Sequence, residues 1–199
     1  VALTGDWHGP RWQVKVTPFY NFVSDYIQGT PIARLDPTGQ PVLQFQNVDR
    51  ADLYGVDALA RYAFNEHFAL RGTLSYVRGI NRDNDDNLYR LAPLHGTVGF
   101  DHRWQGWEST IEVVLVNEQN QVAAYNNEPR TPGYALLNLR TGYTFRDRFT
   151  VQVALENVTD ERYAEHLGGI NRVLGSDVGV GERIPGAGRF VYAMASVRY

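Results

Sequence analysis

Hydrophobic and polar residues alternate along much of this chain with a period of two. The alternation is clearest over residues 54–64, where every second side chain is apolar and the positions between include Asp57 and Arg61. A second alternating run, at 68–76, follows after a short polar segment at 65–67. A period of two places apolar side chains on one face of a β-strand. The two runs therefore predict an antiparallel hairpin with a short turn.

The same unit recurs twice further along the chain. Alternating runs at 94–104 and 107–115 flank a turn at 105–106, and later runs flank a turn at 146–148. Other strands are predicted at 12–17 and at the C-terminal end, with a weak opening run at Val1–Thr4. We expect about nine antiparallel strands in all. The later runs are 135–145, 149–155 and 191–199.

The predicted connections alternate between short and long. Long polar connections rich in Asn, Asp, Gly and Pro are expected at 29–40, 80–93, 119–133 and 158–187. This asymmetry is typical of outer-membrane β-barrels, which have short periplasmic turns and long extracellular loops. The pattern therefore favours an all-β, antiparallel transmembrane β-barrel.

Aromatic side chains flank each of the three predicted short turns, as expected of a girdle at one membrane interface. Residues 42–63 could form one continuous strand of about twenty residues, which is longer than strands in soluble sheets. The alternative is a soluble β-sandwich whose strand ends carry aromatic residues to close its core, and partition into detergent would separate the two. The flanking residues are Tyr62, Phe64, Phe68, Trp104, Trp107, Phe145 and Phe149.

Composition excludes several classes of protein. The 199 residues are 43% hydrophobic and 13% aromatic, which is typical of a folded chain. No apolar run approaches the roughly 18 residues that a membrane-spanning helix requires, whereas the strands of a barrel can be half polar. The absence of cysteine excludes disulfides, thiolate zinc sites and thiol nucleophiles. A net charge of −3 argues against a nucleic-acid partner.

Five segments, in the same order along the chain, resemble the motifs of TonB-dependent outer-membrane receptors. Residues 46–57 are similar to the family's "N-x-x-x-A-x-x-x-G-V-E" segment, with Asp57 where Glu is usual. In the fourth segment Val158 and Thr159 replace Leu and Phe. Together the matches cover residues 40–199. The residues that carry them are Asn47, Gly55, Asp57, Pro93, Pro132, Gly133, Tyr134, Asn157, Asp160, Tyr163, Gly188 and Arg189.

The resemblance implies that residues 1–199 are the C-terminal part of a barrel of 22 strands. An odd count of nine strands would leave an unpaired edge in lipid, and Val1 follows no initiator Met or signal segment. We therefore expect the sequence to be truncated, with earlier strands and an N-terminal plug domain upstream. The alternative is a small outer-membrane barrel that acts as a passive pore or structural protein.

The function that the resemblance implies is TonB-dependent import of a scarce nutrient across the bacterial outer membrane. The cargo would be a metal chelate, siderophore, cobalamin or metal ion. The implied partners are outer-membrane lipid, the TonB complex through the missing plug, and the barrel-assembly machinery through the C-terminal strand, which ends at the signal residue Tyr199. No cofactor is implied.

Residues 166–183 resemble the corresponding loop of copper-associated receptors in this family. This resemblance makes His166, Asn171 and Arg172 candidate ligand-binding residues. The alternative for His166 is an ordinary surface histidine, because copper sites need several N or S donors and this chain has no Cys and one Met. We therefore predict no metal site within the chain.

No catalytic site is predicted, and we do not expect an enzyme. The five histidines are scattered, and none is paired convincingly with a serine or aspartate in the sequence. Asn157 and Asp160 are interpreted as residues that end a strand, because both side chains can bond to nearby backbone groups.

Overall fold

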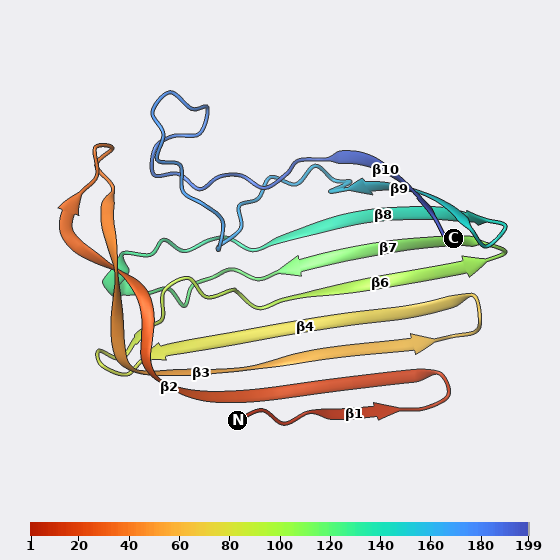
Figure 1. Cartoon of the computed structure of the whole chain (residues 1–199), viewed down its shortest axis with the longest axis horizontal. Helices are drawn as coiled ribbons and strands as arrows, with labels where there is room; N and C mark the ends of the chain where they lie inside the picture. Colours follow the sequence, from red (N-terminus) through yellow and green to blue (C-terminus); the bar gives the residue numbers. More distant parts are fainter. Residues whose placement is uncertain (199) are drawn as a thin grey trace.

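The computed structural model of the chain describes residues 1–198, and its regular secondary structure is almost entirely β-strand (Figure 1). Tyr199, the predicted assembly signal, lies outside the described residues. The described chain contains ten strands and one short 3₁₀ helix, η1, at Ala124–Asn126. The strands are β1 (Gly5–His8), β2 (Trp12–Leu35), β3 (Pro41–Ala63), β4 (Phe68–Asn81), β5 (Asp86–Asn87), β6 (His95–Trp104), β7 (Trp107–Val116), β8 (Tyr134–Phe145), β9 (Phe149–Glu156) and β10 (Phe190–Val197).

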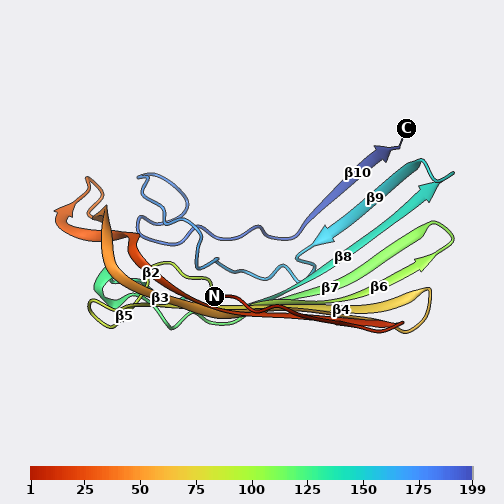
Figure 2. The same ribbon diagram turned by 60° about the horizontal axis from the view of Figure 1, so that its bottom comes forward.

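Nine of these strands form one continuous antiparallel sheet in chain order, with β5 attached beside β4. The sheet is curved and open, so β1 and β10 are its two edges (Figure 2). Each strand runs opposite to its neighbour, so β1 and β10 point in the same direction. A closed antiparallel barrel needs an even number of strands. The sheet is therefore one continuous section of a barrel wall, as the alternating pattern predicts.

Short turns lie at one end of the sheet and long connections at the other (Figure 1). The long connections at 82–94, 117–133 and 157–189 confirm three of the predicted loops. The prediction of a long loop at 29–40 is wrong, because pairing continues to Leu35↔Pro41 and leaves only a tight turn. Where neither face of a hairpin is buried, paired strands need no strict alternation, and their polar sequence then resembles that of a loop.

The first hairpin also differs from the prediction. The opening strand is Gly5–His8 rather than Val1–Thr4, although Ala2 forms an isolated bridge with Phe19. The chain then turns at 9–11 and enters β2. Trp7 and Trp12 flank this turn in the same way as aromatic residues flank the later short turns. β1 has only four residues, which is too short a run for the alternation of apolar and polar side chains to identify it as a strand.

The two faces of the sheet have opposite character. Apolar side chains such as Leu74, Ile111 and Val153 are 44%, 51% and 44% exposed. Within the described chain no second sheet covers them, and the buried apolar cluster consists only of Val48, Ala51 and Leu88 with their neighbours. A soluble sandwich would bury this face. The structure therefore contradicts the sandwich alternative, and the outward face has the character of a lipid-facing surface.

Aromatic residues border the outward face near the short turns and, on β2 and β3, at the opposite end as well. Trp12 pairs with Tyr62 near the short turns, and eight residues away Tyr20 pairs with Tyr54, their rings stacked at 5.6 Å. Eight residues span about 26 Å along a strand, enough to cover most of the roughly 25 Å apolar band once strand tilt is included. No helix of residues 1–198 has the length and apolar character needed to cross a bilayer.

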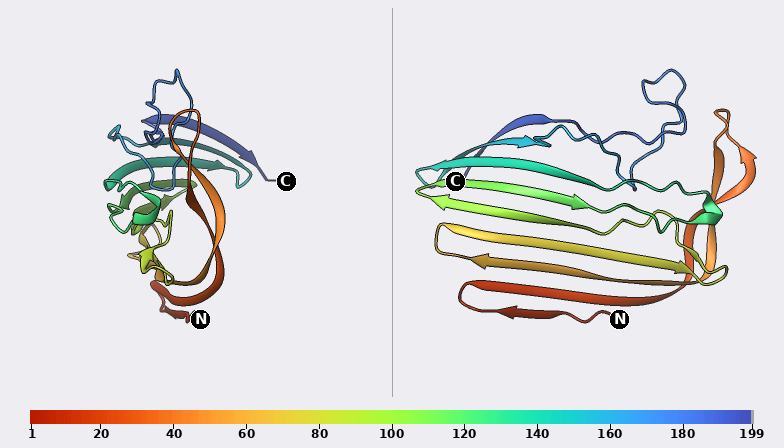
Figure 3. Two further views of the ribbon diagram at one scale, coloured as in Figure 1. Left: turned by 90° about the vertical axis from the view of Figure 1, so that its left-hand side faces the viewer. Right: turned by 180° about the vertical axis from the view of Figure 1, so that it is seen from behind.

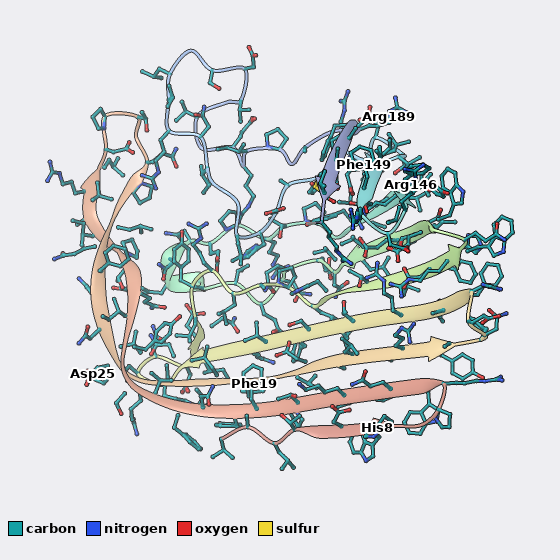
Figure 4. All side chains as sticks on the ribbon, turned by 45° about the vertical axis from the view of Figure 1, so that its right-hand side comes forward. His8, Phe19, Asp25, Arg146, Phe149 and Arg189 are labelled. Carbon is teal, nitrogen blue, oxygen red and sulfur yellow. The ribbon has the colours of Figure 1, made fainter. Side chains whose placement is uncertain are left out.

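The long hairpin of β2 and β3 bends away from the sheet at Asp25, which is labelled at the corner in Figure 4. Asp25 has a φ of 54°, a conformation uncommon for residues other than Gly, Asn and Asp. Beyond the bend, Tyr26 and Val48 turn inward and pack with Leu88. The bend therefore carries the tip of the hairpin out of the plane of the sheet.

Candidate functional site

Charged side chains form a continuous ladder across the inward face of the sheet. Arg71 of β4 lies 3.3 Å from Asp101 of β6 and donates to Glu112 of β7 at 3.0 Å. Arg140 of β8 then joins Glu112, at 2.9 Å, to Glu156 of β9. We call these five residues the inner ladder. The sequence pattern places all of them on the polar face but does not show which residues pair.

The carboxylates of the inner ladder are more buried than its arginines. The side chains of Glu112 and Glu156 are 11% and 13% exposed, whereas those of Arg71 and Arg140 are 36% and 38% exposed. Each of these two buried carboxylates is therefore paired with an arginine whose guanidinium is also partly exposed to water. Paired charges of this kind suit the wall of an aqueous lumen better than the interior of a soluble domain.

His166 occupies a buried position where two long connections meet. Its Nε2 lies 3.1 Å from Glu128 Oε1, and its Nδ1 lies 3.0 Å from the hydroxyl of Thr131. The side chains of His166 and Glu128 are 1% and 2% exposed. His166 is therefore buried, unlike an ordinary surface histidine. We call His166, Glu128, Thr131 and Arg183 the loop cluster.

Backbone groups and the guanidinium of Arg183 complete the loop cluster. Glu128 accepts the amide N–H of Ala123 at 2.8 Å and that of Arg90 at 2.9 Å. Arg183 donates to the carbonyl of His166 at 2.5 Å, and burial lowers the pKa of its guanidinium. The loop cluster thus ties the connections at 82–94, 117–133 and 157–189 together at their bases.

The loop cluster does not provide a complete metal-binding set. Among residues 1–198, no group of three or more His, Asp or Glu side chains could hold a metal ion. One histidine and one carboxylate leave too few donors for copper or zinc. Any metal bound here would need further donors from outside the described residues.

The other two candidate ligand-binding residues lie nearer the tip of the last connection. Asn171 is buried and donates to the carbonyls of Val173 and Val178, so it folds the loop on itself. Arg172 is 47% exposed and contacts Asp36 of the β2–β3 turn at 3.1 Å. Of the three candidates, only Arg172 has a side chain that is exposed to solvent.

Several family-motif residues meet at the ends of β8, β9 and β10 that carry the long connections. The rings of Tyr134 and Tyr163 lie 4.5 Å apart, and the side chain of Asn157 bonds to Glu161 and to the carbonyl of Ala187. Asp160 accepts the amide N–H of Arg189 at 2.8 Å. β9 ends at Glu156, and both Asn157 and Asp160 adopt positive φ values just beyond it. These contacts give the motif residues an evident role in joining neighbouring strands.

Comparison with protein families decides which family this sheet comes from. Residues 1–158 match the family described as "TonB dependent receptor-like, beta-barrel". The chain belongs to the TonB-dependent receptor family. Members of this family are outer-membrane transporters and not enzymes. The strand order and the resemblance of the sequence motifs agree with this assignment. No relative is found among curated proteins.

Three solved structures contain a sheet of the same fold. The copper transporter OprC superposes with a TM-score of 0.88 at 21% identity, covering 96% of this chain and 29% of that chain. The ferric yersiniabactin receptor FyuA from Yersinia pestis matches with a TM-score of 0.69 at 16% identity, covering 98% and 29%. The ferric enterobactin receptor PfeA from Pseudomonas aeruginosa matches with a TM-score of 0.71 at 17% identity, covering 98% and 30%. The chain therefore spans under a third of these receptors.

Proposed function

We propose that this chain is the C-terminal part of a receptor that imports a scarce nutrient across the outer membrane, driven by TonB. The observation that carries the proposal is the inner ladder, which makes one face of a membrane-spanning sheet a charged, water-accessible wall. A receptor with a plugged aqueous lumen needs such a wall. An outward apolar face bordered by aromatic residues near the short turns supports the same arrangement.

The proposal includes strands and a plug domain outside this sequence. Both sheet edges expose backbone N–H and C=O groups, which cost several kcal/mol each in hydrocarbon when unpaired. Because β1 and β10 run in the same direction, an odd number of further strands would close the barrel with antiparallel pairs throughout. TonB would act through the plug, and lipid would cover the outward face. The C-terminal strand would be recognised by the barrel-assembly machinery.

For the cargo, copper ions are the first candidate to test, with ferric siderophores second. The copper transporter OprC and the ferric enterobactin receptor PfeA are both similar in fold, and the loop around His166 resembles that of copper-associated receptors. A cargo arriving from outside would meet the exposed guanidinium of Arg172 before the buried ring of His166.

Uptake by cells that express the full receptor tests the proposal. Radioactive copper(II) and radioactive ferric enterobactin are supplied separately to cells with and without TonB. We expect accumulation of one of them that is lost without TonB. Accumulation that continues without TonB would instead identify a passive pore. If cells accumulate neither probe, copper and ferric enterobactin are excluded as cargo.

Copper binding by the full receptor tests the role of His166. His166→Ala should weaken binding if the loop cluster contributes to the cargo site, either as a ligand or by shaping the loop. His102→Ala is the matched control, because His102 stacks on Phe68 at 4.8 Å near the opposite end of the sheet. Equal copper affinity in the His166→Ala variant and the unmodified receptor would remove His166 from the site.

A further inference from the structure

The hairpin beyond Asp25 crosses the concave side of the sheet. Residues 26–48, which we call the strap, leave the sheet beside β1 and β4 and rise toward the connection between β9 and β10. Figure 3, left, views the molecule from the end with the long connections and shows the strap reaching this last connection across the inward side. The two segments come from opposite ends of the strand order. They therefore meet over the concave side of this section of the barrel wall, at the end that carries the long connections.

One ion pair joins the strap to the last connection. Arg172 Nη1 lies 3.1 Å from Asp36 Oδ2. The other oxygen, Oδ1, accepts the amide N–H groups of Thr38 and Gln40 at 2.8 and 2.9 Å and the Thr38 hydroxyl at 2.6 Å. These bonds fix the carboxylate with its free oxygen directed at Arg172. The turn is thus built to present one oxygen to the guanidinium.

The base and the tip of the last connection, residues 157–189, are held in place by different kinds of contact. At its base, His166 and Glu128 are almost completely buried, and Arg183 donates to backbone carbonyls of two connections. At its tip, the Arg172 and Asp36 side chains are 47% and 19% exposed. An ion pair that water reaches on one side contributes little to stability because water and salt screen it. The tip contact can therefore break while the base remains intact.

We propose that the strap and the last connection form a gate over the part of the lumen mouth that this sheet borders, with Asp36 and Arg172 as its latch. This proposal rests on the proposed import function, because a gate is useful only where something passes. In the closed state the latch is formed, as in the structure described here. In the open state the strap separates from the last connection, and the loop cluster keeps the base of that connection in place.

Distances between spin labels in the full receptor test the latch without any cargo. Nitroxide labels are attached at Leu35→Cys and Val173→Cys, both exposed positions on either side of the latch, in a chain region that has no native cysteine. We expect a short-distance population that shrinks in favour of longer distances when Asp36→Asn removes the charge. Asp177→Asn, an exposed change in the same connection, is the control and should leave the distribution unchanged. If Asp36→Asn has no effect on the distances, the latch is refuted.

Crosslinking tests whether the gate must open. A short bis-maleimide joins Asp36→Cys to Arg172→Cys in the full receptor in living cells, and uptake is measured with copper(II) or ferric enterobactin, whichever the unmodified receptor accumulates. We expect crosslinking to abolish uptake. The matched control joins Leu35→Cys to Pro41→Cys, which are paired within the strap, and should leave uptake intact.

The two hypotheses fail in different ways. Undiminished uptake through the crosslinked receptor would overturn the gate while leaving import standing. Absence of TonB-dependent uptake of either probe by the unmodified receptor would contradict these cargoes, and the spin-label distances would still decide whether the latch exists.

Discussion

Arg140 and Glu156 form a two-point ion pair across the β8–β9 hairpin, with Nε to Oε1 at 2.8 Å and Nη2 to Oε2 at 3.0 Å. The third nitrogen of the same guanidinium donates to Glu112. Arg140→Ala should lower the free energy of unfolding of the full receptor by about 1 kcal/mol, a figure reduced for the partial exposure of Arg140. Urea unfolding in detergent measures it. Arg140→Lys, which cannot form the two-point contact, should lose about as much, and full stability of both variants would contradict this role.

Gly55 marks a place where no side chain fits. A Cβ there would lie 1.9 Å from the carbonyl oxygen of Tyr76 and 2.8 Å from the ring of Phe19. Gly55→Ala should therefore reduce the amount of assembled barrel, measured by the heat-dependent mobility shift on electrophoresis. Gly72→Ala on the opposite face is the control, since its Cβ meets only a carbonyl at 3.5 Å. Equal assembly of the two variants would show that the β3–β4 contact can relax.

Val113 and Val114 are adjacent in β7 but face opposite sides of the sheet. Val113 pairs with Val98 and Leu137 on the outward side, whereas Val114 pairs with Thr97 on the inward side. Val113→Arg should destabilise the barrel in a bilayer by about 2–4 kcal/mol, as expected of a charge placed in lipid. Val114→Arg should cost much less, because its side chain reaches water. A reversed order in vesicle unfolding experiments would mean that the two faces have been assigned the wrong way round.

Glu128 accepts one buried amide N–H, from Ala123, and one partly buried amide N–H, from Arg90, as well as contacting His166. Glu128→Ala would leave the N–H groups of Ala123 and Arg90 without partners, at a cost of about 1–3 kcal/mol. We expect faster hydrogen exchange at both amides, measured by mass spectrometry. Glu118→Ala, in the same connection but exposed, is the control. Unaltered exchange at Ala123 would mean that another group or water replaces the carboxylate.

The contact between the strap and the last connection should weaken only in strong acid, because it depends on the charge of the Asp36 carboxylate. The Thr38 hydroxyl, the Gln40 and Thr38 amides and Arg172 hold the pKa of Asp36 below its ordinary value of 3.8. A lowered pKa in the folded state stabilises the contact fully above pH 3.8, and this contribution is lost as the pH falls through the folded value. The label distances should therefore stay constant from neutral pH to about pH 5. Lengthening within that range that persists in Asp36→Asn would assign the titration to another group.

The alternation of apolar and polar residues was sufficient to predict the faces, the direction and the approximate number of strands. It succeeds because lipid and lumen impose opposite requirements on successive side chains. It fails where neither requirement applies. Gly29, Thr30 and Pro31 have the composition of a turn, yet they lie in β2, beyond the bend at Asp25.

The candidate site was less predictable because it depends on contacts between distant residues. Periodicity places Arg140 inward, but only the register between strands brings it to Glu112 and Glu156. His166 and Glu128 are separated by 38 residues, and nothing in either local sequence indicates that they meet. The motif residues Asn157 and Asp160 were interpretable earlier because their role is local.

The long connections each begin and end on strands that are already paired with one another through the membrane. A connection can therefore be lengthened, shortened or replaced without altering the register on either side of it. Grafting the segments 82–94, 117–133 and 157–189 together from a relative would transfer an intact loop cluster along with them. Grafting one alone would separate His166, Glu128 and Arg90, so changes of cargo in this barrel should arise through coordinated exchange of all three.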